Sequence, residues 1–191
     1  MANSKLIVVE GPQGAGKTTV TDYIRHSLKY TNLYRLCGTA DSTPTGKKKA
    51  SDMYWDLIEY IEKMENKSIN LVFDRTFFTE EIYSRLKFKE YSFSDEYEKL
   101  LEKFSKLDFD IYYITLYLKD TNLFNKRLIR DDKAITEYAK FNIESSKNQQ
   151  IEYLKMADEI SSKYPNIKVF KVSNDTDEQE LKTKIKNILN F

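Results

Sequence analysis

The sequence predicts an α/β fold in which a five-stranded parallel sheet carries helices on both faces. Two observations indicate this fold. Five short β-rich runs alternate with longer segments whose apolar residues recur at helical spacing. The first run, residues 6–9 (LIVV), is apolar throughout, as expected for a strand that is covered on both faces. In sheets of this kind, ligands bind beyond the carboxyl ends of the strands.

The five strands are expected where aliphatic, aromatic and β-branched residues cluster between turn signals. They are residues 6–9, 33–36, 69–73, 111–118 and 167–172. The run 111–118 is the strongest, because it is rich in tyrosine and β-branched residues. The first and third runs end at Glu10-Gly11 and Asp74-Arg75, which places polar residues at the expected ligand-binding edge.

Helical spacing marks the segments between and after these strands. Helices are expected at residues 17–29, from 51 through 64, around 82–86, around 97–104, at 121–130, from near 136 towards 163, and from 176 through 188. The first carries Val20, Ile24 and Leu28 four residues apart on one face. The long sixth helix should stop before Pro165, because a residue that precedes proline disfavours helical backbone. The last helix should begin at Thr176, because residues 176–179 (TDEQ) have the form of a capping box.

Length and composition indicate a single domain, residues 1–191. The 31 basic and 30 acidic side chains give a net charge of +1, which argues against a protein built mainly to neutralise nucleic-acid phosphates. Cys37 is the only cysteine, so no intramolecular disulfide can form. No apolar run approaches the roughly 20 residues that span a bilayer, and the N-terminal run is too short for a signal peptide. We expect a soluble, cytoplasmic protein with no membrane partner.

A phosphate-binding loop follows the first expected strand. Residues 11–18 satisfy G-x-x-x-x-G-K-[ST] and lead into an expected helix. Glycines let backbone N–H groups converge on phosphate oxygens, and the following helix directs its positive end to the same place. Lys17 should reach the β- and γ-phosphates of a bound nucleotide, and Thr18 should ligate Mg²⁺. The expected nucleotide-binding residues are Gly11, Gln13, Gly14, Ala15, Gly16, Lys17, Thr18 and Thr19.

Features outside the loop favour a compact kinase. No Asn-Lys-x-Asp tetrapeptide is present, which weighs against a GTPase of the Ras type, and the chain is too short for helicase or motor modules. At the end of the third strand, Asp74 can hold Mg²⁺ directly or through water. Arg75 offers a planar fork that grips a phosphate or aligns an oxygen acceptor.

Two motifs carry a family resemblance. Residues 9–19 (VEGPQGAGKTT), followed by 74–79 (DRTFFT), resemble the thymidylate kinase and deoxynucleoside kinase superfamily. Residues 43–47 (TPTGK) faintly resemble a stretch that thymidylate kinases carry after their second strand. The order of elements is similar over essentially the whole chain. The resemblance implies the five-stranded parallel sheet of the nucleoside monophosphate kinase type, commonly as a homodimer.

The same resemblance implies roles for individual residues. It places Lys17 and Thr18 on the donor phosphates and the metal, Asp74 near the metal, and Arg75 on the 5′ group of the acceptor. It also implies a basic lid at about residues 126–136, which closes over the donor phosphates. Pro12-Gln13 and Asp74 depart from the usual pattern of the superfamily, so the acceptor stays open.

Glu10 bears on the choice of acceptor. A nucleoside 5′-hydroxyl must lose a proton, and nucleoside kinases of this superfamily use the equivalent glutamate as the base. A monophosphate has a second pKa of about 6 and is already an anionic nucleophile. Thymidylate kinases keep a glutamate at this position as well, so Glu10 leaves both acceptors open. A pairing of Glu10 with Arg75 or another basic residue is a further alternative.

Candidates at the rim of the site are weaker. Arg127 and Arg130 lie three residues apart on one helix face and can neutralise transition-state charge, although a solvated helix end is the alternative. Lys47-Lys48-Lys49 should be an exposed basic run. Candidates to line the acceptor pocket, each with core packing as the alternative, are Arg35, Tyr54, Trp55, Phe77, Phe78 and Tyr83.

The sequence therefore predicts an ATP- and Mg²⁺-dependent kinase acting on a nucleoside monophosphate, such as the deoxynucleotide dTMP. Its expected catalytic residues are Lys17, Arg75, Glu10, Arg127 and Arg130. Three alternatives stay open: a deoxynucleoside kinase with Glu10 as general base, a kinase acting on a hydroxyl of a nucleic acid, and an ATP-binding switch that transfers no phosphate.

Overall fold

The computed structural model describes residues 4–36, 38–130 and 143–191. The described strands are β1 (Lys5–Glu10), β2 (Thr31–Arg35), β3 (Asn70–Asp74), β4 (Asp110–Tyr117) and β5 (Lys168–Ser173). The described helices are α1 (Lys17–Ser27), α2 (Gly46–Lys63), α3 (Phe77–Arg85), α4 (Ser94–Ser105), α5 (Leu123–Arg130), α6 (Ile143–Lys163) and α7 (Glu178–Leu189).

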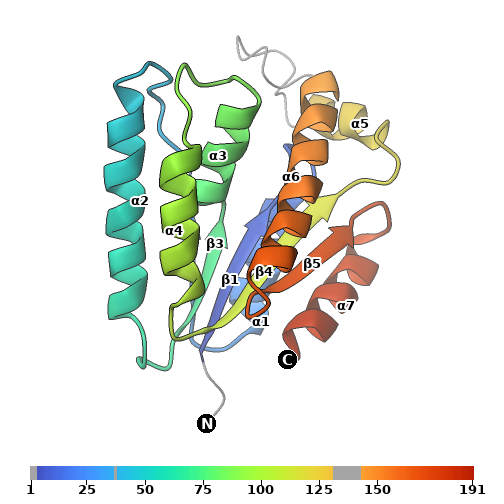
Figure 1. The fold of residues 1–191 in the computed structure, drawn as a ribbon. Helices are drawn as coiled ribbons and strands as arrows, with labels where there is room; N and C mark the ends of the chain where they lie inside the picture. Colours follow the sequence, from blue (N-terminus) through green and yellow to red (C-terminus); the bar gives the residue numbers. More distant parts are fainter. Residues whose placement is uncertain (1–3, 37, 131–142) are drawn as a thin grey trace.

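The strands form one parallel sheet in the order β2-β3-β1-β4-β5, which confirms the predicted fold class. Strand β1 lies at the centre and pairs with β3 and β4 on its two sides. All carboxyl ends therefore lie along one edge of the sheet (Figure 1). The register pairs Val9 with Asp74, and Arg35 with Asp74. This pairing brings the end of β2 and the Asp-Arg motif level with the end of β1.

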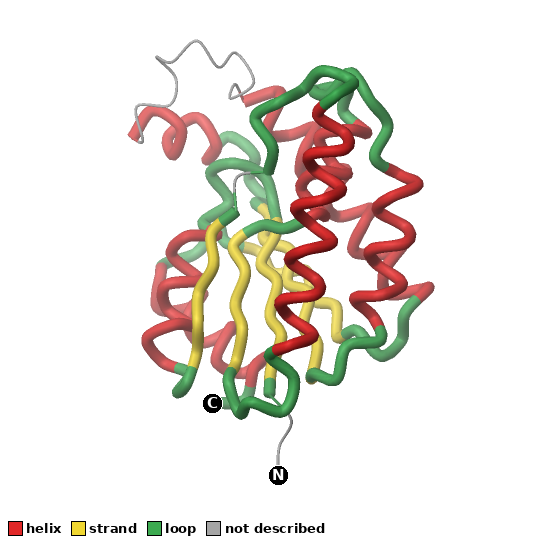
Figure 2. Tube along the Cα trace, turned by 90° about the vertical axis from the view of Figure 1, so that its left-hand side faces the viewer, coloured by secondary structure: helices red, strands yellow, loops and turns green. Residues whose placement is uncertain are grey.

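Two hydrophobic layers hold the sheet, and β1 contributes alternately to both. Leu6 and Val8 pack with α2, α3, α4 and α6 on one face. Ile7 and Val9 pack with α1 and α7 on the other. Figures 1 and 2 show helices on both faces of the sheet. Successive side chains of a strand point to opposite faces, so the uninterrupted apolar run of β1 follows from its position at the centre of the sheet.

Helix α2 starts earlier than the sequence suggested, at Gly46 rather than Ser51. Each lysine of the run 47–49 lies within 2.7 Å of an aspartate, namely Asp95, Asp52 and Asp41 in that order. These carboxylates balance the repulsion among three adjacent cations, so the basic run can form the first turn of a helix.

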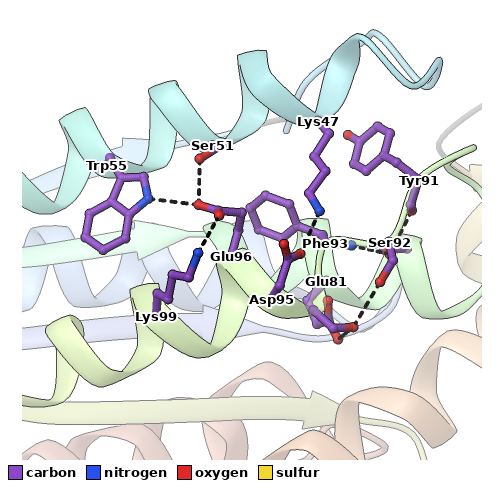
Figure 3. Close-up of polar contacts among 12 residues, drawn as sticks. Lys47, Ser51, Trp55, Glu81, Tyr91, Ser92, Phe93, Asp95, Glu96 and Lys99 are labelled. Atoms are coloured by element: carbon purple, nitrogen blue, oxygen red, sulfur yellow. Dashed lines mark hydrogen bonds and ion pairs between the residues drawn. The ribbon is translucent and has the colours of Figure 1, made fainter.

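Polar contacts join α2 to α4 (Figure 3). The indole Nε1 of Trp55 donates to Oε2 of Glu96 over 3.1 Å, and the Ser51 hydroxyl donates to the same oxygen over 2.7 Å. The ion pair between Lys47 and Asp95 adds a further contact between the two helices. The prediction that Trp55 lines the acceptor pocket is therefore wrong, because its polar edge is bound to α4.

Helix α7 begins one residue later than its predicted cap. Asp177, not Thr176, occupies the N-cap position, and its Oδ1 accepts a hydrogen bond from the Glu180 backbone N–H at 2.8 Å. A charged carboxylate also suits the positive end of a helix better than a hydroxyl does, which accounts for the one-residue difference. Thr176, which does not cap the helix, lines the cleft described below.

Candidate functional site

The phosphate-binding loop connects β1 to α1 as the sequence predicts. Gly16 occupies the N-cap of α1 with a left-handed backbone, φ 97°, and Lys17 is the first helical residue. The Lys17 ammonium folds back over the loop, where its Nζ donates to the carbonyls of Gly11 at 2.7 Å and Pro12 at 2.8 Å. A cation and the positive end of a helix thus lie at the same point, an arrangement suited to binding phosphate.

Two positions of the loop require glycine, because there is no room for a Cβ atom and because the backbone φ is positive. A Cβ on Gly11 would lie 2.6 Å from the carbonyl oxygen of Leu116, at the end of β4. A Cβ on Gly16 would lie 2.3 Å from Nδ2 of Asn174. Both residues have positive φ, 143° and 97°, a backbone region that disfavours other residues. The loop therefore fits closely against the ends of β4 and β5.

Asp74 and Thr18 lie where the sequence expects a magnesium site. The Thr18 hydroxyl lies 3.4 Å from Oδ2 of Asp74. Both are hard oxygen ligands, and Mg²⁺ is commonly bound by one or two protein oxygens together with substrate phosphates and water. Within the described residues, no group of three or more His, Cys, Asp or Glu side chains could hold a metal on its own. The donor set therefore fits a magnesium ion that is shared with a nucleotide.

Arg75 turns into the cleft on a strained backbone. Its φ is 70°, and its N–H donates across to the Val9 carbonyl at 3.3 Å. Non-glycine residues in this region cost on the order of 1–3 kcal/mol and cluster at functional sites. No carboxylate among the described residues lies within 4.0 Å of the guanidinium. Burial lowers the pKa of Arg75, but the nearby phenols of Tyr83 and Tyr153 and the carboxylates of Asp74 and Glu10 raise it by more. The net effect is a pKa above the usual value, so the guanidinium keeps its charge.

Glu10 ends β1 with its side chain fully buried, at 0% exposure. Its Oε1 accepts from the Thr76 N–H at 2.8 Å, and its Oε2 accepts from the Thr79 hydroxyl at 2.7 Å. The Thr79 hydroxyl also lies 2.9 Å from the Tyr153 hydroxyl. Burial raises the pKa of Glu10 to about 7, against the opposing effects of these hydrogen bonds and of the nearby Lys17. The alternative in which Glu10 forms an ion pair with Arg75 is wrong, because its partners are the two threonines.

The loop, Asp74 and Arg75 line one cleft of about 370 Å³. Its walls come from the loop and the start of α1, the carboxyl ends of β2 and β3, helix α5, the segment after β5 and the start of α7. The lining residues are Gln13, Gly14, Gly16, Lys17, Thr18, Thr19, Arg35, Leu36, Asp74, Arg75, Arg127, Asn174, Thr176, Glu178 and Leu181. Most of the expected nucleotide-binding residues, both expected metal ligands and three expected arginines thus meet in one place.

Several predicted residues lie elsewhere. Tyr54, Phe77 and Phe78 have at most 1% exposure and pack in the hydrophobic core, so the prediction that they line the acceptor pocket is wrong. The rings of Phe77 and Phe78 stack with their centroids 4.3 Å apart, and helix α3 directs both towards α4. Gly11 and Ala15 belong to the loop but are buried behind the cleft.

The remaining rim candidates differ in position. Tyr83 is partly buried and packs its ring edge against Phe88, 5.5 Å between centroids. Arg35 reaches the cleft, where Nη2 pairs with Asp22 at 2.5 Å and Nε lies 3.6 Å from Oδ2 of Asp74. Arg127 binds the phosphate-binding loop itself, donating to the Gly14 carbonyl at 2.9 Å.

The expected lid, at about residues 126–136, lies only partly within the described residues. Arg130 is the last residue of α5, and its side chain lies outside the described part of the chain, as do residues 131–142.

The sequence reasoning missed one wall of the cleft. Asn174, Thr176, Glu178 and Leu181 come from the segment after β5 and the start of α7, and Leu36, which follows β2 at the other edge of the sheet, was missed as well. A signal was present, because β5 ends at Ser173 and the segment after it must lie at the same edge as the ends of β1 and β3. Applying the strand-end rule to every strand would have identified Asn174 and Thr176.

Comparisons with known proteins agree with this geometry at the level of the fold. No family model matches the chain, and no curated protein matches it. Among solved structures it is similar to a thymidylate kinase from Candida albicans, with TM-score 0.70, 18% identity, and coverage of 100% of this chain and 92% of that one. A thymidylate kinase from Ehrlichia chaffeensis gives TM-score 0.63, 13% identity, and coverage of 98% and 99%.

A deoxyadenosine kinase from M. mycoides, solved with bound dCTP, is similar with TM-score 0.53 and 20% identity, covering 97% of this chain and 98% of that one. None of the described helices is long and apolar enough to cross a membrane. The parallel five-stranded sheet, the phosphate-binding loop and these structural neighbours together show that the chain has a P-loop fold of the nucleoside monophosphate kinase type.

Proposed function

We propose that the protein is a Mg²⁺- and ATP-dependent kinase that transfers the γ-phosphoryl group to a nucleoside monophosphate. The observation that carries this proposal is Arg75. Arg75 lines the same cleft as Lys17, and no carboxylate among the described residues lies within ion-pair distance, 4.0 Å, of its guanidinium. A retained cation in the same cleft as a phosphate-binding loop suits a second phosphate.

The donor half of the cleft fits the triphosphate of ATP. Loop N–H groups, the start of α1 and the Lys17 ammonium offer positive charge at one point. Thr18 and Asp74 would hold Mg²⁺, which supplies charge neutralisation to the phosphates when it is bound. The chain itself positions two anions in line and stabilises the charge that spreads over the transferred group.

The surroundings of Glu10 favour a monophosphate acceptor over a nucleoside. Its two carboxylate oxygens accept hydrogen bonds from Thr76, the N-cap of α3, and from Thr79 in its first turn, and Glu10 is not among the residues that line the cleft. Glu10 fixes the turn that carries Arg75, rather than facing a hydroxyl nucleophile. A monophosphate, with a second pKa of about 6, needs no base.

One observation favours a deoxynucleoside kinase as the second candidate. Burial raises the pKa of Glu10 to about 7, a value suited to a general base at neutral pH. Exchanging Glu10 for glutamine separates the candidates. A nucleoside kinase should lose activity by about 10²–10⁴-fold. A monophosphate kinase should lose much less, because the amide can keep the hydrogen bond from the Thr76 N–H.

The ion pairs of the basic run 47–49 weigh against the alternative of a kinase that acts on a nucleic acid. Lys47, Lys48 and Lys49 each pair with an aspartate, so the run presents little net positive charge to a polynucleotide. The net charge of +1 points the same way.

An acceptor panel tests the proposal. The protein is incubated with MgATP and, separately, with nucleosides, nucleoside monophosphates and short oligonucleotides, and ADP formation is followed. We expect turnover with monophosphates, and dTMP is the first to test because thymidylate kinases are among the structural neighbours. Lys17→Ala is the matched control and should lower kcat by about 10²–10³-fold, since it removes a cation that stabilises transition-state charge.

Three results would contradict the proposal. Turnover with nucleosides alone would favour the deoxynucleoside kinase, turnover with oligonucleotides alone would favour the nucleic-acid kinase, and ATP binding without turnover would favour the switch. A homodimer and a cytoplasmic location stay predictions, and light scattering of the purified protein tests the former.

A further inference from the structure

Two side chains from the second half of the sequence bind carbonyl groups of the phosphate-binding loop. Asn174 directly follows β5, and its Nδ2 donates to the Ala15 carbonyl at 2.7 Å. Arg127 of α5 donates from Nη1 to the Gly14 carbonyl at 2.9 Å and from Nη2 to the Asn174 carbonyl at 2.6 Å. The side chains of Asn174 and Arg127 thus form a connected set with the loop, in which Arg127 joins the loop to the end of β5.

These bonds fix the direction of the N–H groups of the loop. In a planar trans peptide the C=O and the following N–H point in opposite directions. Holding the carbonyls of Gly14 and Ala15 towards α5 and β5 therefore turns the N–H groups of Ala15 and Gly16 the other way. The Ala15 N–H does point into the loop, towards the Pro12 carbonyl at 3.2 Å. The Lys17 ammonium binds that same carbonyl at 2.8 Å.

Asn174 is itself held firmly. Its side chain has 7% exposure, and its backbone N–H donates to the Tyr117 carbonyl at 2.9 Å. It occupies the space that the missing Cβ of Gly16 leaves, since that Cβ would lie 2.3 Å from Nδ2. The glycine before Lys17 and the asparagine after β5 thus form a complementary pair, although they lie far apart in the sequence.

We propose that Asn174 is a positioning residue for the phosphate-binding loop and that Arg127 acts with it. Together they hold two loop carbonyls outward, so that the Ala15 N–H closes the loop on the Pro12 carbonyl and the Gly16 N–H faces the phosphates of the nucleotide. The proposal rests on the proposed function for the identity of the ligand. It assigns Arg127 to the orientation of the loop, in place of the charge neutralisation from a lid that the sequence suggested.

Binding of the phosphate chain alone provides the test. Asn174→Ala is titrated calorimetrically with MgATP and with magnesium tripolyphosphate, which contains no base or sugar. The variant loses one hydrogen bond that orients the loop, so we expect both affinities to fall by a similar factor of about three to ten. Asn166→Ala is the matched control, because its Nδ2 makes an equivalent bond to the Ser105 carbonyl at 2.6 Å, away from the cleft.

Other outcomes overturn the proposal. If Asn174 contacts the base of ATP, the variant weakens ATP and leaves tripolyphosphate unchanged. If Asn174 only supports the fold, the melting temperature falls while both affinities stay at the wild-type value. Should Asn174→Ala not fold, Arg127→Lys replaces it: lysine keeps the charge but lacks the planar fork with which Nη1 and Nη2 of Arg127 donate to the carbonyls of Gly14 and Asn174. Unchanged tripolyphosphate affinity in that variant refutes the proposal.

The failure of the proposed function would look different. A wild-type protein that binds tripolyphosphate but transfers no phosphate would contradict the kinase and leave the role of Asn174 intact. A wild-type protein that binds neither ATP nor tripolyphosphate would overturn both.

Discussion

Exchanging Glu10 for glutamine should change the way in which the stability of the protein depends on pH. Glu10 is fully buried, and its two carboxylate oxygens accept hydrogen bonds from Thr76 and Thr79. Glutamine has nearly the same shape. Its carbonyl can accept from the Thr76 N–H, and its amide can donate to the Thr79 hydroxyl, so the variant should fold with the network largely preserved.

The size of the change in unfolding free energy follows from the shift in the pKa of Glu10. Burial raises the pKa of Glu10 from 4.5 to about 7, so the folded protein holds this proton more tightly than the unfolded chain does. The stability that the proton provides is fully present below pH 4.5 and is lost as the pH rises through 7. At 1.36 kcal/mol per pKa unit, the loss amounts to about 3 kcal/mol. Glutamine carries no charge at any of these pH values and avoids the loss.

The Glu10→Gln variant should therefore be less stable than the wild type by about 1 kcal/mol at pH 4.5, through weaker hydrogen bonds. It should be more stable by about 2 kcal/mol at pH 8.5, so the difference changes by about 3 kcal/mol across the range. Urea unfolding of both proteins at several pH values measures this difference in unfolding free energy. The fluorescence of Trp55, the only tryptophan, is the signal. A difference that stays constant from pH 5 to 9 would refute the assigned burial effect.

An exposed glutamate, Glu59, provides a control, because its pKa is shifted in the opposite direction to that of Glu10. The Glu59 carboxylate lies 2.6 Å from Lys63, and this hydrogen bond lowers its pKa. The contribution of the pair is present above the pKa of the unfolded chain and is lost as the pH falls. Glu59→Gln should therefore differ from the wild type mainly above pH 4.5, and by much less than Glu10→Gln does.

Three further predictions concern the site and the fold. Arg75→Lys keeps the charge but loses the planar fork, so the KM for the monophosphate should rise by about tenfold while the KM for ATP is unchanged, which steady-state kinetics can check. Gly16→Ala should weaken MgATP binding by more than about tenfold in calorimetry, because the added Cβ meets Asn174 and the backbone is left-handed; wild-type affinity would contradict the described geometry. Asp177→Ala removes the cap on the Glu180 N–H and should lower the unfolding free energy by about 1 kcal/mol in urea.

The parts of the site that the sequence predicts correctly are set by local backbone geometry. The spacing of the phosphate-binding loop specifies a strand, a turn of glycines and a helix start, and all three appear where expected. Asp74-Arg75 is also local, because it ends a strand that a short apolar run defines. The strand-end rule then brings the two motifs together without knowledge of any longer-range contact.

The errors arise where tertiary packing decides the direction of a side chain. Phe77 and Phe78 directly follow the Asp-Arg motif, yet the first turn of α3 directs both rings into the core, where the Phe78 ring meets that of Tyr113 at a centroid distance of 4.8 Å. An aromatic residue at a helix start can face a ligand or the core, and only the packing of the helix against α4 and β4 determines which. Asn174 escaped notice because its partner Ala15 lies 159 residues away.

The two carboxylates at the sheet edge are separated by the alternation of strand side chains, which the sequence does encode. Val9 and Val72 face α1, so Asp74, two residues after Val72, faces α1 as well and meets Thr18 in its first turn. Glu10 has the opposite phase, shared with Val8, and points to the face of α3. The parallel register that pairs Val9 with Asp74 keeps both carboxylates at the same level. One acidic residue thereby lies in the cleft beside Thr18, and the other is buried, where it accepts hydrogen bonds from Thr76 and Thr79.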